Sequence, residues 1–160
     1  MIYIGSDHGG FELKDEIYKY VKNVMKIDIK DMGIYDNNAA DYPDIAVTVC
    51  NEVLSQKGIG ILICGTGIGI SMTANKIAGI RCALCSEEYS AKMARMHNDA
   101  NVLALGGRTL GPELAKSIVE RFLTTGYQNL ERYEIRLNKI SEVEKKNNTL
   151  SEEDRVKRNC

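Results

Sequence analysis

Short apolar stretches alternate along this chain with segments in which apolar residues recur at helical spacing. Each apolar stretch is four to six residues long, a usual length for a β-strand. The predicted strands are residues 2–5, 27–32, 59–64, 80–85 and 101–105. The predicted helices are residues 11–24, 44–55, a short stretch that ends at Lys76, 87–96 and 112–123. Strands that alternate with helices predict an α/β domain with a parallel sheet covered on both faces.

The most apolar stretch, residues 59–64, is almost uninterrupted, which is typical of a central strand buried on both faces. We therefore expect a single-domain, three-layer α/β/α fold of Rossmann-like type with a five-stranded parallel sheet. The strand order does not follow from the pattern. Residues 130–143 predict a sixth helix without a strand after it. The domain is expected to span residues 1–146, and the charged residues 147–160 to form a frayed C-terminal tail.

The charge balance narrows the classes of function. The 160 residues carry 21 Lys and Arg against 22 Asp and Glu, whereas a protein that coats a polyanion usually has a basic excess. No apolar stretch approaches the roughly 20 residues that span a bilayer, and the N-terminus lacks the pattern of a secretory signal. Five cysteines at irregular spacing do not form a disulfide framework. We therefore expect a cytoplasmic protein that binds neither nucleic acid nor a membrane.

Candidate chemistry lies in the segments that follow the predicted strands, because ligands of open parallel sheets bind beyond the carboxyl ends of the strands. These segments are residues 6–10, 64–69, 86–87 and 106–108. The glycines of residues 65–69 let backbone N–H groups turn inward, and the helix that follows adds partial positive charge. This loop suits a phosphate or a developing oxyanion, although a tight glycine turn without a ligand is the simpler interpretation.

The same loop admits a dinucleotide-binding fingerprint as a rival interpretation. Its two possible placements leave Met72 or Ile70 where the third glycine should stand. Glu87 lies 20 residues after Gly67 at the end of the next predicted strand, a position suited to a ribose contact. A nucleotide- or phosphate-binding module without catalysis therefore remains an alternative.

Cys64 ends the apolar strand beside the glycine loop, where the helix N-terminus favours a thiolate. It suits a nucleophile or a general base, but a free cysteine is often only a small buried hydrophobic residue. Thr66 can hydrogen-bond the sulfur or a substrate oxygen. Cys82 and Cys85 form a C-x-x-C within a predicted strand, whereas redox and zinc pairs lie at helix starts or tight turns, so a structural role is favoured.

Both histidines lie in predicted connecting segments beside other polar side chains. Asp7 and His8 follow the first strand, with two glycines after them. His97 and Asn98 are predicted to lie in a loop just before the fifth strand. Each pair is a candidate for a binding or catalytic site.

Two arginines are candidates for binding a phosphate. Arg132 and Arg136, four residues apart, share one face of the last predicted helix. Alternatively, this face is merely solvated, because Glu131 and Glu134 are close enough to pair with them.

These motifs resemble the type B ribose-5-phosphate isomerases, a family that also includes subunits of galactose-6-phosphate isomerase. The matching segments are GSDHGGFELK at 5–14, DYPD at 41–44, GILICGTGIGISMTANK at 60–76 and GIRCALCSEEYSAKMARMHNDANVLALGGR at 79–108. The match runs in order from the N-terminus to about residue 145 and is specific in motif as well as in fold.

The resemblance implies reversible aldose–ketose conversion of ribose 5-phosphate to ribulose 5-phosphate, a step of the pentose phosphate pathway, without a metal or organic cofactor. Cys64 matches the general base that moves a proton between C1 and C2, Thr66 its hydrogen-bonding neighbour, and His97 the residue that opens the furanose ring. The amides that match the anion hole for the enediolate include those of Gly65, Gly67, Ile68 and Gly69. The implied substrate contacts are Asp7 and Tyr42 at sugar hydroxyls, Asn98 beside His97, His8, Arg132 and Arg136 at the phosphate, and Arg108 near the site.

The resemblance also implies a homodimer or a tetramer in which the neighbouring subunit completes each active site. The sixth helix fits this role because it has no strand of its own to cover. An isomerase of a six-carbon phosphate, such as allose 6-phosphate or galactose 6-phosphate, is the second interpretation, since pocket length is not legible in the sequence. A thiol-redox function of Cys82 and Cys85 ranks last.

Overall fold

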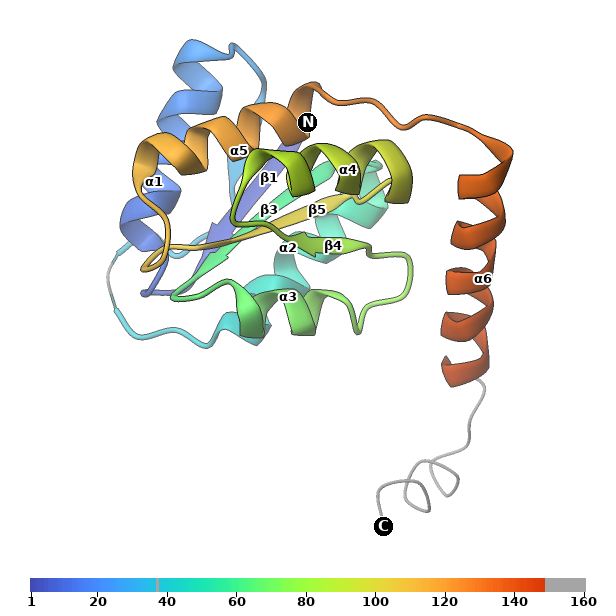
Figure 1. The fold of residues 1–160 in the computed structure, drawn as a ribbon. Coiled ribbons are helices and arrows are strands. Elements are labelled where there is room, and N and C mark those ends of the chain that lie inside the picture. The colour runs from blue at the N-terminus through green and yellow to red at the C-terminus, as the bar shows by residue number, and fades with distance from the viewer. Residues whose placement is uncertain (37, 149–160) are drawn as a thin grey trace. The chain divides into compact units, whose positions relative to one another are not determined.

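The computed structural model of this chain describes residues 1–36 and 38–148, which belong to two compact units (Figure 1). The first unit is Met1–Tyr127, and the second begins at Gln128. The strands of the first unit are β1 (Ile2–Ser6), β2 (Ile29–Asp31), β3 (Ile59–Cys64), β4 (Cys82–Leu84) and β5 (Val102–Gly106). Its helices are α1 (Phe11–Lys19) with the π-helical turn η1 (Tyr20–Val24), α2 (Tyr42–Gln56), α3 (Ile68–Ala74), α4 (Glu88–Asn98) and α5 (Pro112–Thr124).

The five strands form one sheet in the order β2-β1-β3-β5-β4, and every neighbouring pair is parallel. The predicted α/β fold with a five-stranded parallel sheet is thus confirmed. The edge strands β2 and β4 have only three residues each. They are shorter than the predicted strands, which were residues 27–32 and 80–85. Ile27, Ile80 and Cys85 lie outside the paired residues but still pack in or against the two cores, so the apolar pattern is longer than each strand.

Side chains that alternate along the strands build one core on each face of the sheet. On one face, α1, α4 and α5 cover a core that contains Ile61 and Ile63. On the other face, α2 and α3 cover a core that contains Leu62 and Cys64. In Figure 1, α4 and α5 lie above the strands and α3 lies below them. The central strand β3 is therefore buried on both faces, as its apolar sequence predicts.

Lys14 of α1 carries a buried charge. Its side chain is 2% exposed, and Nζ donates to both carboxylate oxygens of Asp31, at 2.9 and 2.7 Å, and to the carbonyl oxygen of Ile34 at 2.5 Å. The rings of Phe11 and Tyr35 have their centres 5.4 and 5.5 Å from the same nitrogen. All three ammonium donors have an acceptor, and the ion pair joins α1 to the end of the edge strand β2.

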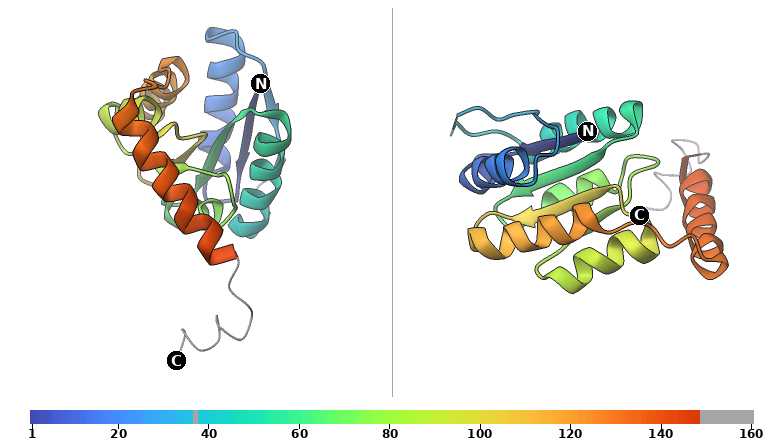
Figure 2. Two further views of the ribbon diagram at one scale, coloured as in Figure 1. Left: turned by 90° about the vertical axis from the view of Figure 1, so that its right-hand side faces the viewer. Right: turned by 90° about the horizontal axis from the view of Figure 1, so that it is seen from above.

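The second unit contains α6 (Glu131–Asn148), a single continuous helix (Figure 2). It ends five residues later than the predicted helix of residues 130–143, with Lys145 and Lys146 in its last turn, where positive charge is favourable. Residues 147 and 148 are therefore helical, although they were expected in the tail. The rest of that tail, residues 149–160, lies outside the described residues. In the described part of the chain, no helix is both long enough and apolar enough to cross a membrane.

Replacing Asp31 by Asn is expected to lower the free energy of unfolding by about 3 kcal/mol, because the buried ammonium of Lys14 loses its counter-charge. The matched control is Asp15→Asn, since Asp15 pairs with Lys19 at the exposed surface of the same helix. Such exposed pairs contribute roughly 0–1 kcal/mol. Urea unfolding of the two variants measures the difference, and equal losses would show that the buried pair does not anchor α1 to β2.

Candidate functional site

The loops after β1, β3 and β5 meet at the carboxyl edge of the sheet. The strand registers pair Ser6 with Ile63 and Cys64 with Gly106, so the three central strands end at nearly the same level. The helices that follow leave toward opposite faces, α1 and α5 on one side and α3 on the other. A crevice forms where adjacent strands send their chains to opposite faces. The loop after β3 is therefore flanked by a candidate binding crevice on each side.

Glycines allow these three loops to touch. A Cβ on Gly9 would lie 2.9 Å from the amide nitrogen of Gly65, and one on Gly107 would lie 2.6 Å from the carbonyl oxygen of Gly9. The N–H of Gly107 donates to the carbonyl of Cys64 at 2.8 Å, and the N–H of Arg108 donates to the carbonyl of Gly65 at 2.9 Å. The three loops thus form one continuous backbone surface.

Cys64 lies at the centre of this surface. It is 5% exposed, and its Sγ accepts a hydrogen bond from the N–H of Gly67 at 3.1 Å. Gly67 has a φ of +77°, and a Cβ there would lie 2.9 Å from the carbonyl carbon of Leu105, so the turn requires glycine. The hydroxyl of Thr66 accepts from the N–H of Ile68 at 3.4 Å. A sulfur, a hydroxyl and backbone amides therefore share one short loop.

Tyr42 and Asp7 lie beside this loop. The ring of Tyr42 packs against the start of α3, because a Cβ on Gly69 would lie 2.7 Å from Cζ and 3.0 Å from the hydroxyl oxygen. Asp7 is 6% exposed, and its Oδ1 has no hydrogen-bond partner among the described protein groups. A buried acceptor without a donor costs roughly 1–3 kcal/mol. The hydroxyl group of a ligand would satisfy this oxygen.

A hollow of about 190 Å³ opens at the loop after β1. Its lining comes from the loops after β1 and β5 and from the first turn of α1, and consists of His8, Gly9, Glu12, Leu13, Gly107 and Arg108. His8, which the resemblance assigns to the phosphate, and Arg108, which it assigns only to the neighbourhood of the site, therefore line one hollow. Glu12 was not predicted to belong to the site, and its only signal in the sequence is its position two residues after the Asp-His-Gly-Gly loop.

His97 and Asn98 lie near the amino ends of the strands, whereas Cys64 lies at the carboxyl end of β3. The prediction of a loop at these residues is wrong, because α4 continues through them until Asp99, at a φ of +42°, ends the helix. A helix between parallel strands returns to their amino ends, and there the carbonyl of Asn98 accepts from Nε of Arg81, at 3.1 Å, just before β4. The six residues of β3 span roughly 16 Å at about 3.3 Å per residue. Within one chain, His97 and Cys64 cannot reach the same substrate atoms.

Arg132 and Arg136 belong to the second unit. They lie four residues apart on α6, and hence on one face of it. Nη2 of Arg132 donates to the hydroxyl of Tyr133 at 2.9 Å, and its guanidinium lies 4.8 Å from the centre of that ring. The local contact orients Arg132, whereas the role of the two arginines in binding a phosphate stays a prediction.

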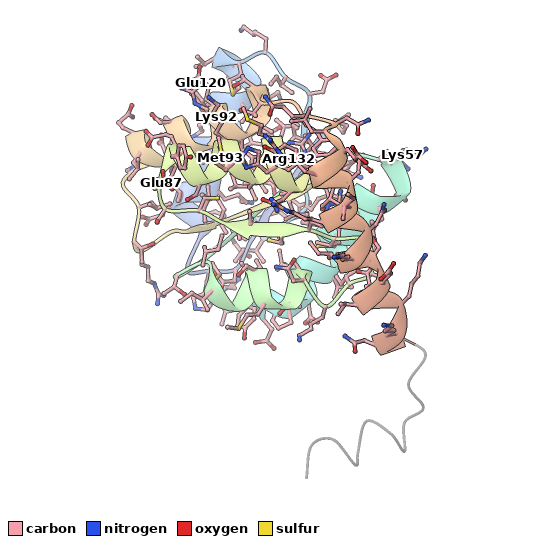
Figure 3. The ribbon with its side chains drawn as sticks, turned by 45° about the vertical axis from the view of Figure 1, so that its right-hand side comes forward. Lys57, Glu87, Lys92, Met93, Glu120 and Arg132 are labelled. Atoms are coloured by element: carbon pink, nitrogen blue, oxygen red, sulfur yellow. The ribbon has the colours of Figure 1, made fainter. Side chains whose placement is uncertain are left out.

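Glu87 argues against a dinucleotide site. It lies at the start of α4 (Figure 3), where its carboxylate accepts the N–H groups of Tyr89 and Ser90 at 2.6 and 2.7 Å. Hydrogen bonding, chiefly with Ser90, holds the pKa of this carboxyl below its usual value. The carboxylate caps the helix instead of pointing at a ribose. In addition, Ile70, at one possible position of the third glycine, is fully buried in the core.

Cys82 and Cys85 do not form a redox pair. They pack on opposite faces of the sheet, Cys82 against the core beneath α2 and α3 and Cys85 in the core beneath α1, α4 and α5. Burial raises the pKa of the Cys85 thiol to about 11 and also raises the pKa of Cys82. Both thiols are therefore protonated near neutral pH, which supports the structural role.

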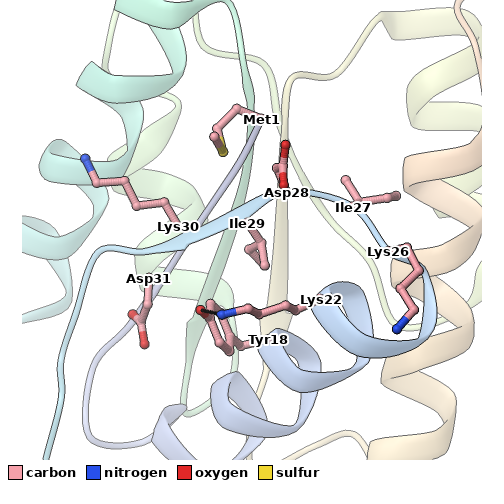
Figure 4. A pocket seen from close by; sticks show the side chains of 9 residues that line it. All are labelled: Met1, Tyr18, Lys22, Lys26, Ile27, Asp28, Ile29, Lys30 and Asp31. Carbon is pink, nitrogen blue, oxygen red and sulfur yellow. Dashed lines mark hydrogen bonds between the residues drawn. The ribbon is translucent and has the colours of Figure 1, made fainter.

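A larger hollow, of about 670 Å³, lies near Met1 at the edge strand β2, away from these loops. Lys22, Lys26 and Lys30 contribute to its lining. In Figure 4, Lys26 and Lys30 point away from each other, and Lys22 turns toward Tyr18, whose hydroxyl accepts from Nζ at 3.1 Å. The ammonium groups do not converge, so this hollow does not form an anion site.

Known proteins resemble the chain over nearly its whole length. A family model described as Ribose/Galactose Isomerase matches residues 2–140. Ribose-5-phosphate isomerase B of Escherichia coli (strain K12) is 45% identical over 148 residues, which cover 92% of this chain and 98% of that protein. The structure of ribose-5-phosphate isomerase B from Clostridium thermocellum matches with a TM-score of 0.87 and 48% identity, over 91% of this chain and 97% of that one. The type B ribose 5-phosphate isomerase of Trypanosoma brucei matches with a TM-score of 0.85 and 43% identity, over 89% and 97%.

Gly67→Ala is expected to lower the free energy of unfolding by roughly 1–3 kcal/mol, because alanine must hold a strained positive φ and meet the backbone of β5. The matched control is Gly65→Ala, whose Cβ would lie 3.5 Å from Cδ of Arg108, an ordinary contact. Thermal unfolding of both variants provides the comparison. Equal melting temperatures would contradict the requirement for glycine in the turn.

Proposed function

Because the chain belongs to the Ribose/Galactose Isomerase family, we propose that it interconverts ribose 5-phosphate and ribulose 5-phosphate, as in the pentose phosphate pathway. The observation that carries this proposal is the placement of the Cys64 sulfur, 3.1 Å from the backbone nitrogen of Gly67, within a loop of glycine amides at the carboxyl edge of the sheet. A base for a C–H proton and donors for a developing oxyanion are thereby side by side. The described cysteines are free thiols, in keeping with a reducing compartment such as the cytoplasm.

Proton transfer starts from the open-chain aldose. The Cys64 thiolate takes the proton from C2, the electron pair forms the C1–C2 double bond, and negative charge develops on O1. The sulfur then returns the proton to C1, while the C2 hydroxyl loses its proton to become the carbonyl and O1 gains one. Amides of the loop from Gly65 to Gly69 stabilise the enediolate, and removing one such donor typically costs about 10²–10³-fold in rate. Thr66 lies beside Cys64 in the loop, and its hydroxyl hydrogen-bonds the sulfur or a substrate oxygen.

The other residues bind the sugar phosphate or open its ring. His97 moves the proton that opens the furanose, a step typically worth about 10²–10⁴-fold, and Asn98 contacts the substrate beside it. Asp7 and Tyr42 bind hydroxyl groups, which suits the unpartnered carboxylate oxygen of Asp7. The phosphate is bound by His8, Arg132 and Arg136, and Arg108 lies near the site.

A second copy of the chain completes each site. His97 lies at the far edge of its own sheet, so the His97 that acts with Cys64 comes from the partner of a homodimer. Apolar side chains beside the glycine loop support an interface there, since Ile68, Met72 and Leu84 are 48%, 62% and 43% exposed. A Cβ on Gly67 would lie only 2.5 Å from Cδ1 of Leu84, so these apolar groups border the site. Exposed apolar patches of this kind mark protein interfaces.

Two variants separate proton transfer from ring opening. Ribulose 5-phosphate cannot form a furanose, because its O5 carries the phosphate, so exchange of its C1 protons with D₂O requires the base alone. Cys64→Ala is expected to lose both ribose 5-phosphate isomerisation and C1 exchange by about 10²–10⁴-fold. His97→Gln is expected to lose isomerisation by a similar factor but to retain exchange.

The assays use excess chelator, with NMR for the exchange and with allose 6-phosphate and galactose 6-phosphate as parallel substrates. Near-normal turnover by Cys64→Ala would overturn the assignment of the base. Activity confined to a six-carbon phosphate would overturn the choice of ribose 5-phosphate.

Co-expression of the two variants tests the shared site. If each site takes Cys64 from one chain and His97 from the other, a mixed dimer contains one intact site. Random pairing then restores about a quarter of the unmodified isomerase activity per chain, although each variant alone is inactive. The control is co-expression of Cys64→Ala with a Cys64→Ala, His97→Gln chain, which contains no intact site. Absence of restored activity in verified mixed dimers would contradict the shared site.

A further inference from the structure

Asp99 ends α4 in a conformation that usually belongs to glycine. Its φ is +42° and its ψ is +45°, and its N–H donates to the carbonyl of Ala94. A helix commonly ends on a left-handed residue, most often Gly, because a Cβ is unfavourable there. Asp is one of the few residue types other than Gly that adopt this conformation readily, and here its carboxylate also forms ion pairs.

That carboxylate lies between two arginines. Oδ2 accepts from Nη2 of Arg81 at 2.8 Å, and Oδ1 accepts from Nη1 of Arg95 at 3.1 Å. The guanidinium of Arg81 also donates through Nε to the carbonyls of Asn98, at 3.1 Å, and of Asp99, at 2.9 Å. Nη1 of Arg95 reaches the carbonyl of Ala100 at 2.6 Å. The two guanidinium groups therefore donate hydrogen bonds to the backbone carbonyls of the turn after α4 as well as to the Asp99 carboxylate.

The two arginines are themselves fixed to the body of the fold. The backbone N–H of Arg81 donates to Oδ1 of Asn101 at 2.8 Å, just before the edge strand β4. The guanidinium of Arg95 lies 5.6 Å from the centre of the fully buried ring of Phe122, and the side chain of Arg95 is 14% exposed. The carboxylate of Asp99 is thus held from two directions, by arginines of two different segments of the fold.

We propose that Asp99 and Arg81 are positioning residues, which hold the chain at His97 and Asn98 in the position that the reaction requires. His97 and Asn98 lie between Arg95 and Asp99 in the sequence, so the network holds the chain on both sides of them. A misplacement of about 1 Å in a catalytic group can cost roughly 10²-fold in rate, and this placement must serve a substrate bound across a subunit boundary. This inference rests on the proposed function, because it concerns the ring-opening step assigned to His97.

The network can be removed without emptying the core. Arg81, Arg95 and Asp99 line a hollow of about 490 Å³ together with Lys57 and Asn101. The side chains of Arg81 and Asp99 are 30% and 37% exposed, so water replaces what a substitution removes. Asp99→Gly also relieves the left-handed backbone, and the helix is expected to end at the same place.

The test compares Asp99→Gly and Arg81→Met with the unmodified protein in two assays at saturating substrate. Isomerisation of ribose 5-phosphate is expected to fall about 10- to 100-fold in both variants, while C1 exchange of ribulose 5-phosphate stays within about threefold. Asp99→Asn, which tolerates the left-handed conformation and keeps one acceptor oxygen, is expected to recover part of the isomerisation. Unchanged isomerisation in Asp99→Gly, or a parallel fall of both reactions, would overturn the proposal.

Two controls keep the result interpretable. Lys116→Met removes two ion pairs of α5, with Glu16 and Glu113, and is expected to leave both reactions unchanged. His97→Gln in the same experiment separates this proposal from the proposed function. If His97→Gln keeps full isomerisation, the ring-opening role itself fails. If His97→Gln loses isomerisation and Asp99→Gly keeps it, only the positioning role fails.

Discussion

The loops after β1, β3 and β5 approach one another more closely than any side chain would permit. Gly9 and Gly107 stand where an added Cβ would lie 2.9 Å and 2.6 Å from the neighbouring backbone, and Gly67 combines close approach with a left-handed turn. Because these residues have no Cβ, backbone amides rather than side chains form the surface around Cys64. A larger residue at any of the three would separate the strand ends and move the sulfur away from its amide donor.

The direction of the helices imposes a second constraint. In a parallel sheet each helix returns the chain to the amino ends of the strands, so residues at a helix C-terminus lie a full strand length from residues at a strand C-terminus. Cys64 occupies one edge and His97 the other. Cys64 and His97 of one chain are therefore separated by the length of a strand, and the proposed reaction, which uses both, requires two chains.

Different interactions hold Cys64 at the carboxyl ends of the strands and the turn after His97 at their amino ends. At the carboxyl edge, glycine removes steric hindrance and lets the backbone itself supply donors around Cys64. At the amino ends of the strands, Asp99 ends α4 with a left-handed backbone, and its carboxylate forms ion pairs with Arg81 and Arg95.

Much of the fold could be predicted from the sequence, because the spacing of apolar residues reflects which positions are buried. The apolar run of β3 and the five alternating strands follow from hydrophobic patterning, and the glycine loop follows from the need for backbone space. The end of α4 did not follow, since no glycine marks it and Asp99 takes the left-handed conformation instead. Tertiary structure decided the strand order, the hollow that His8 and Arg108 share, and the separation of His97 from Cys64. Each of these depends on how strands far apart in the sequence pair, and such pairing leaves no local pattern in the sequence.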